Sequence, residues 1–170
     1  ESLQAYSWKK SMKWSTYDLQ WGRPLRSIIA LFDEKVVNFN FHHLKSGNII
    51  LLGDLNDEKQ KKVDNFQHYL TLLKSQNIIL NHEERKNFIL KKFSKICISQ
   101  KLKNEFDDKL VDEVVNLVEK PSVITCKFNS IYLKIPKEIL IVTMQKHQKY
   151  FPLFENNGEL SNLFLIVANL

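Results

Sequence analysis

The sequence predicts an α+β fold: a mostly antiparallel sheet with helices packed on one side of it. Short strand-like stretches lie in the first third of the chain, stretches with a helical period of 3.6 residues dominate the middle, and strands with one more helix follow in the last third. An Asn157-Gly158 pair between two apolar runs is a strong β-hairpin signal. Three strands in close succession near the start imply an antiparallel meander, which is typical of this class.

Length and composition predict a folded segment of a longer protein. The chain has 170 residues, of which 44% are hydrophobic and 26% charged, so it can bury a real core. We expect residues 1–10 to be a lead-in and residues 11–170 to form a single α+β domain. The chain starts at Glu1 without a methionine and ends within an apolar run, so we expect it to be a fragment.

The first third predicts three strands in close succession, which favours an antiparallel meander. The predicted strands are Ser27–Phe32 (or a short buried helix), Lys35–His43 and Ile49–Leu52. The second is the clearest, because Val37, Phe39 and Phe41 alternate with polar residues. Turns are expected at Asp33-Glu34 and Ser46-Gly47-Asn48, and a charged connector at 54–62.

Helices and a second group of strands follow. The helical periods lie at Asn65–Gln76, Asn81–Ser99, Asp107–Glu119 and Pro136–His147. Asn81 and Glu84 are spaced as in a capping box. Strands are expected at Ser122–Phe128, Tyr150–Phe154 and Leu163–Ala168, with the last two paired across the Asn-Gly turn.

Several function classes lack support in the sequence. There is no GxGxxG, GxxxxGK[ST], GxSxG or HExxH motif, and the two cysteines, Cys97 and Cys126, have no metal-ligand spacing. We therefore expect no active site, metal or cofactor in this segment. With no apolar run of transmembrane length and no signal peptide, we expect a cytoplasmic protein. The net charge of +6 permits a polyanionic partner without requiring one.

The most promising polar cluster follows the last predicted helix. The candidate RNA-contacting residues are Lys146, His147, Gln148, Lys149 and Tyr150. Their ammonium, imidazole and phenol groups can contact phosphate and stack on a base. The alternative is structural: by the 3.6-residue period His147 ends a buried stripe with Ile139, Leu140, Thr143 and Met144, and caps the helix.

A second candidate cluster consists of Arg23, Arg26 and Lys45, which surround the first predicted strands. Arginine suits bidentate contact with phosphate. The alternative is that these residues form surface ion pairs with carboxylates such as Asp33 or Glu34.

The chain resembles the N-terminal half of the β subunit of bacterial heterotetrameric glycyl-tRNA synthetase. The resemblance covers roughly 160 residues in order, far more than a short motif. It is carried by Lys10-Ser11-Met12-Lys13-Trp14, Arg23-Pro24-Leu25, Leu117-Val118-Glu119-Lys120-Pro121, Phe128, Leu133-Lys134-Ile135-Pro136-Lys137-Glu138-Ile139-Leu140, Met144, His147-Gln148-Lys149-Tyr150-Phe151, Gly158, Leu160, Phe164 and Ala168-Asn169.

The resemblance implies a class II aminoacyl-tRNA synthetase assembled as α2β2. In that family the α subunit holds the glycine and ATP sites, and the β subunit is needed to engage tRNA. The implied partners are the α subunit and tRNA(Gly), with no membrane and no DNA, and ATP is used only through the α subunit. The region is also similar to the B3/B4 module of phenylalanyl-tRNA synthetase, an α+β unit.

One departure from the family pattern concerns residues 46–53. Where the family usually has Gly-His-Arg-Phe, this chain has Ser46-Gly47-Asn48-Ile49-Ile50-Leu51-Leu52-Gly53. The role of that segment is therefore open. The main prediction is a non-catalytic part of a glycine-tRNA ligase β subunit that supports subunit assembly and tRNA contact. The alternatives are a stand-alone RNA-binding or protein-interaction module and a hydrolytic editing domain.

Overall fold

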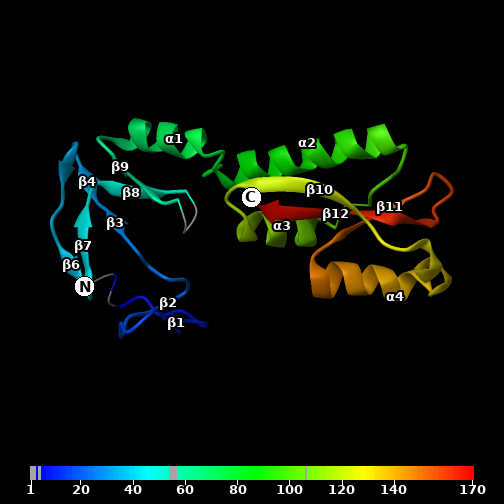
Figure 1. Cartoon of the computed structure of the whole chain (residues 1–170), viewed down its shortest axis with the longest axis horizontal. Coiled ribbons are helices and arrows are strands. Elements are labelled where there is room, and N and C mark those ends of the chain that lie inside the picture. The colour runs from blue at the N-terminus through cyan, green and yellow to red at the C-terminus, as the bar shows by residue number, and fades with distance from the viewer. Residues whose placement is uncertain (1–2, 4, 54–56, 106) are drawn as a thin grey trace. The chain divides into compact units, whose positions relative to one another are not determined.

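The structure is a computed structural model that describes residues 3, 5–53, 57–105 and 107–170. These residues form the predicted α+β fold, with mostly antiparallel sheets and four α-helices among them (Figure 1). The chain divides into two compact units, Glu1–Leu72 and Leu73–Leu170, which we call the N-terminal and C-terminal units. The prediction of one domain over residues 11–170 stays a prediction.

The N-terminal unit is built from short strands. They are β1 (Met12–Lys13), β2 (Gln20–Trp21), β3 (Ile28–Ile29), β4 (Leu31–Phe32), β5 (Lys35–Val36), β6 (Asn40–Phe41), β7 (Leu44–Gly47), β8 (Ile49–Leu52) and β9 (Lys59–Lys62). The tight connection predicted at Asp33-Glu34 is confirmed, since both residues have a positive φ, 48° and 62°, and join β4 to β5. Two positive φ values in sequence give the turn whose twist suits a two-residue hairpin.

The predicted strand Lys35–His43 is wrong in its middle. Residues 37–39 lie outside any strand, and Val37 is 46% exposed. The cause is Ser46, whose hydroxyl donates to the Val37 carbonyl (2.7 Å) and accepts from the Phe39 N–H (2.8 Å). A buried side chain thus satisfies backbone groups that a strand partner would otherwise bind.

Ser46 also overturns the turn predicted at Ser46-Gly47-Asn48, because it lies in β7 and is buried. The predicted meander is wrong at the same strand: β7 pairs antiparallel with β6 but parallel with β3. In the predicted connector 54–62, residues 59–62 form β9, which pairs with β8, and residues 54–56 lie outside the described residues. All four side chains of β9 are polar and exposed, so the sequence has no alternation of apolar and polar residues there that would predict a strand.

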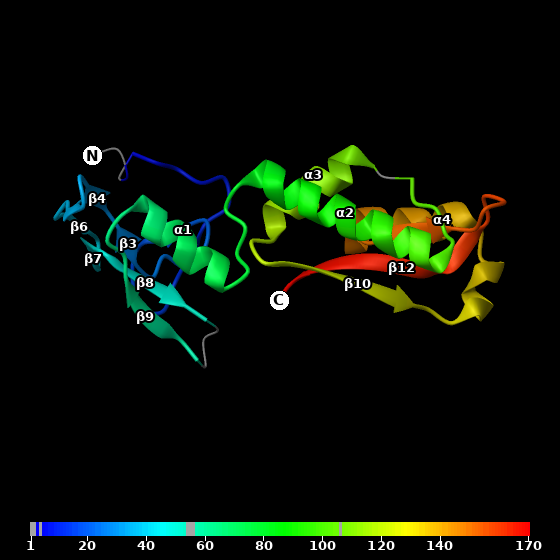
Figure 2. The ribbon, with the colours of Figure 1, turned by 90° about the horizontal axis from the view of Figure 1, so that it is seen from above.

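The C-terminal unit follows the sequence-based prediction closely. After α1 (Phe66–Ser75), whose last residues belong to this unit, come α2 (His82–Gln100), α3 (Asp108–Leu117), β10 (Pro121–Lys127), the 3-10 helix η1 (Ser130–Lys134), α4 (Lys137–Val142), the π-helix η2 (Thr143–Gln148), β11 (Phe151–Phe154) and β12 (Leu160–Asn169). The three strands form an antiparallel sheet in the order β10-β12-β11. Figures 1 and 2 both show α2 running alongside this sheet.

One hydrophobic core joins α2, α3 and the sheet. Its buried residues are Ile89, Phe93, Leu102, Leu110, Val111, Val114, Val115, Val118, Phe151, Leu153 and Leu165. The rings of Phe93 and Phe151 lie 4.6 Å apart and are tilted by 59°, a favourable aromatic geometry. Side chains from α2, α3, β11 and β12 thus pack together in one buried cluster.

Local signals set the ends of the two core helices. The Asn81 side chain accepts from the Glu84 N–H at 3.0 Å, so the predicted cap of α2 is confirmed. Asp107 caps α3 through the N–H groups of Lys109 and Leu110. These oxygens satisfy helix N–H groups that have no partner within the helix.

The predicted β-hairpin is also confirmed. β11 and β12 pair antiparallel around residues 155–159. Gly158 has a φ of 85° and donates its N–H to the Glu155 carbonyl (3.0 Å). This backbone conformation favours glycine.

The last predicted helix, Pro136–His147, is confirmed in its extent, but its second half does not have the predicted 3.6-residue period. α4 ends at Val142, and η2 continues with a wider turn. Met144 is buried as predicted, but Ile139 is 57% exposed, and Thr143 and His147 are exposed as well. A π-helix has more residues per turn than an α-helix, so residues spaced for a 3.6-residue period no longer share one face there.

The capping role predicted for His147 is wrong for a related reason. The carbonyl of Met144, which a capping side chain would bind, accepts the backbone N–H groups of Lys149 and Tyr150 instead. Lys149 has a positive φ of 59°, and this left-handed residue closes the helix through its backbone. The imidazole is left exposed.

We predict that Ile89→Ala lowers the free energy of unfolding by about 2–5 kcal/mol, since a buried isoleucine loses its packing and leaves a cavity. Ile89 is 0% exposed. The matched control is Ile98→Ala on the same helix, at a residue that is 79% exposed, and we expect a change within about 0.5 kcal/mol. Urea unfolding measures the free energy of unfolding of both variants. An equal decrease in the two variants would contradict the placement of Ile89 in the core.

We predict slow alkylation of the Cys97 thiol at neutral pH. Burial raises the pKa of the Cys97 thiol above its ordinary value. At neutral pH the reactive thiolate is therefore a smaller fraction of this cysteine than in the unfolded chain, and the fraction grows as the pH is raised. Mass spectrometry of the Cys97 peptide after iodoacetamide treatment gives the rate as a function of pH. The same peptide in urea should react faster at each pH, and identical rates in both states would contradict the prediction.

Candidate functional site

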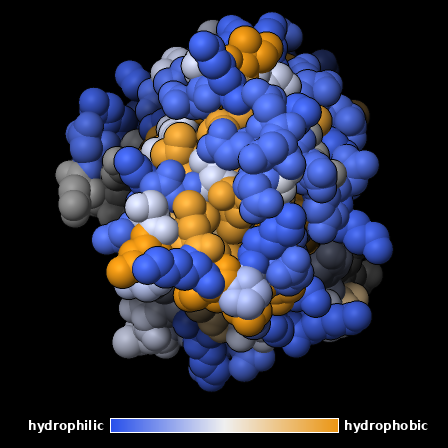
Figure 3. Space-filling model, turned by 90° about the vertical axis from the view of Figure 1, so that its right-hand side faces the viewer, coloured by the Kyte–Doolittle hydropathy of each residue, from blue (hydrophilic) through white to orange (hydrophobic). Residues whose placement is uncertain are grey.

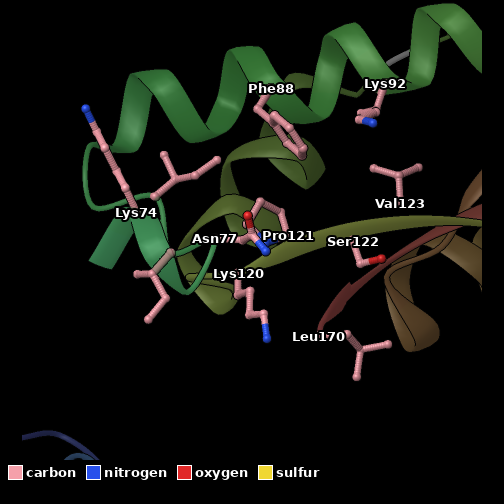
Figure 4. Close-up of a pocket in the computed structure, with 11 residues that line it drawn as sticks. Lys74, Asn77, Phe88, Lys92, Lys120, Pro121, Ser122, Val123 and Leu170 are labelled. Atoms are coloured by element: carbon pink, nitrogen blue, oxygen red, sulfur yellow. The ribbon is translucent and has the colours of Figure 1, made fainter. Parts of the chain in front are cut away.

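The C-terminal unit contains a pocket of about 460 Å³ lined by cationic, aromatic and polar side chains. Its polar lining includes Lys74, Asn77, Lys92, Lys120 and Ser122, and its aromatic ring is Phe88 (Figure 4). Isoleucines, Pro121 and Val123 provide an apolar wall. Lysines around a partly apolar hollow suit an anionic ligand that also has an apolar or planar surface.

Three different elements bring the lysines to the pocket. Lys74 comes from the end of α1, Lys92 from α2, and Lys120 from the short link between α3 and β10. Phe88 and Lys92 are four residues apart on α2 and therefore lie on one face. The Lys92 ammonium lies 5.4 Å from the centre of the Phe88 ring, in a cation–π contact.

The labelled side chains point in different directions. Phe88 and Lys92 project from α2 on the side of β10, whereas Lys74 and Lys120 extend outward from the rim (Figure 4). Lysine has a long flexible stem with a compact charge, so rim lysines can reach an approaching phosphate. The pocket therefore combines one aromatic ring with three lysines from different elements.

Backbone hydrogen bonds hold the pocket wall in place. The Ile79 N–H donates to the Glu119 carbonyl (2.9 Å), which joins the segment after α1 to the segment after α3. The Asn169 side chain accepts from the N–H groups of Glu119 (3.0 Å) and Lys120 (2.8 Å). The link that carries Lys120 is thus fixed to the end of β12.

Arg85 also links the segments that form the pocket wall, through side-chain hydrogen bonds. Its guanidinium donates to the carbonyls of Val115 (2.9 Å) and Ile79 (2.5 Å). In the sequence Arg85 lies among alternating charges that suggest a solvent-exposed helix face. The structure shows instead that it connects α2, α3 and the pocket wall.

The charge of the pocket is not neutralised locally. Within the described part of the chain, no ion pair engages Lys74, Lys92 or Lys120. Elsewhere in the unit, Lys86 pairs with Asp112 at 2.7 Å, and this hydrogen bond raises the pKa of Lys86. The pocket lysines therefore remain available for an external anion.

The predicted cluster at residues 146–150 lies in η2 and the turn after it. Lys146, His147 and Gln148 are exposed. Lys149 pairs with Glu113 of α3 at 2.9 Å, and the Tyr150 ring stacks on Phe164 at 5.0 Å. Two of the five side chains thus serve the fold of this unit, and RNA contact by the cluster stays a prediction.

The other predicted cluster lies in the N-terminal unit. Arg26 forms an ion pair with Glu58, which is a pairing of the kind expected but with a different carboxylate from Asp33 or Glu34. Lys45 is exposed on β7 opposite Asn40. RNA contact by Arg23, Arg26 and Lys45 stays a prediction.

The sequence-based reasoning missed the pocket because its lysines are far apart in the chain. Lys74, Lys92 and Lys120 are separated by 18 and 28 residues, and only the fold joins them. One partial signal exists, the Phe88-Lys92 spacing of four residues on a helix. Among the described residues, no group of His, Cys, Asp and Glu could hold a metal ion, and no helix is long and apolar enough to cross a membrane.

Comparison with known proteins gives a consistent result. The family described as "Glycyl-tRNA synthetase beta subunit" matches residues 1–170. A protein of Rickettsia akari (strain Hartford) named glycine–tRNA ligase beta subunit is 38% identical over 169 residues, covering 99% of this chain and 26% of its own length. Proteins of the same name from Rickettsia canadensis (strain McKiel) and Rickettsia felis (strain ATCC VR-1525 / URRWXCal2) are each 37% identical.

The chain spans about a quarter of the length of these relatives. The family match nevertheless extends over every residue of the chain, as the resemblance of its motifs predicts. The chain therefore belongs to the glycyl-tRNA synthetase beta subunit family, whose members are aminoacyl-tRNA synthetase subunits.

Proposed function

We propose that this segment is a non-catalytic, tRNA-contacting part of a glycine–tRNA ligase beta subunit. In this proposal it supports ATP-dependent attachment of glycine to tRNA(Gly) together with an α subunit, in an α2β2 assembly. The α subunit supplies the glycine and ATP sites. The segment supplies a cationic surface for tRNA, and it holds no cofactor of its own.

The pocket around Lys74, Lys92 and Lys120 is the observation that carries this proposal. Phosphate contacts by lysine dominate the affinity of proteins for nucleic acids. Three lysines with no ion pair among the described residues lie around one hollow, and such a cluster of positive charge favours binding of a phosphodiester chain. The Phe88 ring offers a surface on which an unpaired base can stack.

The pocket also suits single-stranded nucleic acid better than a duplex. Its volume of about 460 Å³ is large enough for part or all of one nucleotide but too small for a double helix. Sequence-specific RNA recognition usually targets loops and ends whose bases can leave the stack. We therefore propose that an unpaired region of the tRNA enters the pocket.

We predict that Lys92→Ala/Lys120→Ala in the full-length beta subunit weakens tRNA binding by about tenfold for each lost phosphate contact. The slope of log K against log salt should fall in magnitude by about one per lost contact. Filter binding at several salt concentrations measures both quantities. Unchanged affinity and slope would exclude the pocket as a tRNA contact.

A separate pair of variants compares the pocket with the cluster predicted from the sequence. Lys149→Ala removes a lysine that already pairs with Glu113, so we predict an unchanged salt slope for tRNA binding. Lys146→Ala removes an exposed lysine and tests the 146–150 cluster directly. A larger loss for Lys146→Ala than for the pocket variant would move the proposed contact from the pocket to η2.

A further inference from the structure

The pocket around Lys74, Lys92 and Lys120, which we call the lysine pocket, contains one polar group that phosphate binding does not use. This group is the amide of Asn77, which has one acceptor oxygen and an amino group with two donors. Asn77 is exposed and lines the pocket together with Phe88 (Figure 4). Within the described residues no hydrogen bond engages the Asn77 side chain, so both ends of the amide are open to a ligand.

The backbone of Asn77 closes helix α1. The Ile78 N–H donates to the Leu73 carbonyl and the Asn77 N–H donates to the Lys74 carbonyl, both at 3.0 Å. These two bonds form a Schellman motif, in which the residue after the helix is left-handed, and Asn77 has a φ of 58°. The motif therefore fixes the point from which the amide extends. Glycine fits the same backbone without strain, because it adopts a positive φ freely.

Exposed apolar side chains elsewhere in the chain do not indicate a ligand in the same way. Figure 3 views the molecule from the right-hand side of Figure 1 and shows hydrophobic side chains at the surface among hydrophilic ones. Apolar surface of this kind is common on folded proteins. The lysine pocket differs because it combines an aromatic ring, lysines and an open amide. These groups suit the face of a base, a phosphate and the polar edge of a base.

An asparagine amide fits adenine better than the other bases. Adenine offers an acceptor next to an amino donor on two edges, N7 with N6 and N1 with N6, and asparagine binds such a pair with both ends of its amide. Guanine has two acceptors, N7 and O6, on the first of these edges, which suits a cation better than an amide. Cytosine and uracil are smaller and cover less of an aromatic ring when they stack.

The lysines complete the site for a nucleotide. The Lys92 ammonium lies 5.4 Å from the centre of the Phe88 ring, so a base on this ring has a cation nearby for its phosphate. Lys74 precedes Asn77 by three residues at the end of α1, so a second ammonium and the amide come from the same chain segment.

We propose that the lysine pocket is selective for adenine: the base stacks on Phe88, the Asn77 amide binds its edge, and the lysines bind its phosphate. The proposal rests on the proposed function, since an unpaired adenine of the tRNA is the ligand that this function implies. Asn77 then determines the base preference, and the lysines determine the overall affinity. Free adenosine monophosphate has the same chemistry, so it is a second probe.

Fluorescence anisotropy with four single-stranded RNA hexamers tests the proposal on the full-length beta subunit. The hexamers are oligouridines in which one central position is adenosine, guanosine, cytidine or uridine. We predict that the hexamer with adenosine binds about tenfold more tightly than each of the others, because only this base pairs with both ends of the amide on either edge. Equal binding of the four hexamers overturns the proposal.

Asn77→Gly removes the amide and keeps the left-handed backbone. We predict that this variant binds the four hexamers equally, with an unchanged salt slope because the lysines remain. Asn77→Asp keeps the shape of the side chain but loses the amino donor, so the adenine preference should also disappear. The matched control is Asn87→Asp, at an exposed asparagine of α2 outside the pocket, which should keep the preference. An adenine preference that persists in Asn77→Gly overturns the proposal.

The lysine variant Lys92→Ala/Lys120→Ala separates this proposal from the proposed function. If it weakens tRNA binding while the unchanged protein binds the four hexamers equally, the pocket contacts tRNA without reading a base, and only the adenine proposal fails. If it keeps normal tRNA affinity while adenosine monophosphate binds the unchanged protein and not Asn77→Gly, the proposed function fails. The adenine proposal then holds with a free nucleotide as the ligand. Calorimetric titration of adenosine monophosphate gives this last result.

Discussion

The packing of α2 and α3 on the three-stranded sheet is the constraint on which the C-terminal unit depends. Phe93 and Phe151 meet at its centre, and Ile89, Val111, Val115 and Leu165 close around them without exposure to solvent. Burial of such side chains is worth roughly 1.5–3 kcal/mol each, which exceeds the net contribution of a single hydrogen bond. The core therefore fixes α2 relative to β10 and leaves Phe88 and Lys92 on the side of α2 that lines the pocket.

The pocket occupies a part of this unit that the core does not use. Arg85 and Asn169 hold the pocket wall through backbone carbonyls and N–H groups, so the lysines project from a fixed frame. On α4 Ile139 and Val142 are exposed, and Met144, in η2, is buried. The pocket lysines proposed to contact an anion therefore lie outside the buried core that sets the fold of this unit.

Much of this architecture could be predicted from the sequence, and the exceptions have physical causes. The capped helix after Asn81, the strand after Pro121 and the hairpin at Gly158 follow from local chemistry, and the structure confirms them. The strand through residues 37–39 failed because the distant Ser46 hydroxyl binds its backbone. The stripe through His147 failed because η2 widens the helical turn.

The candidate site was less predictable than the fold. A local cluster such as residues 146–150 is visible in the sequence, but the structure shows that Lys149 and Tyr150 already have partners, Glu113 and Phe164. The pocket lysines come from three separate elements, so no spacing rule could join them. Motif resemblance identified the family, and the family match over residues 1–170 agrees with it.

Lysine acetylation of the full-length beta subunit, followed by mass spectrometry with and without tRNA, tests the central claim most directly. We predict that tRNA protects Lys74, Lys92 and Lys120, while Lys86, which pairs with Asp112, reacts equally in both conditions. Equal reactivity of the three pocket lysines with and without tRNA would contradict the account.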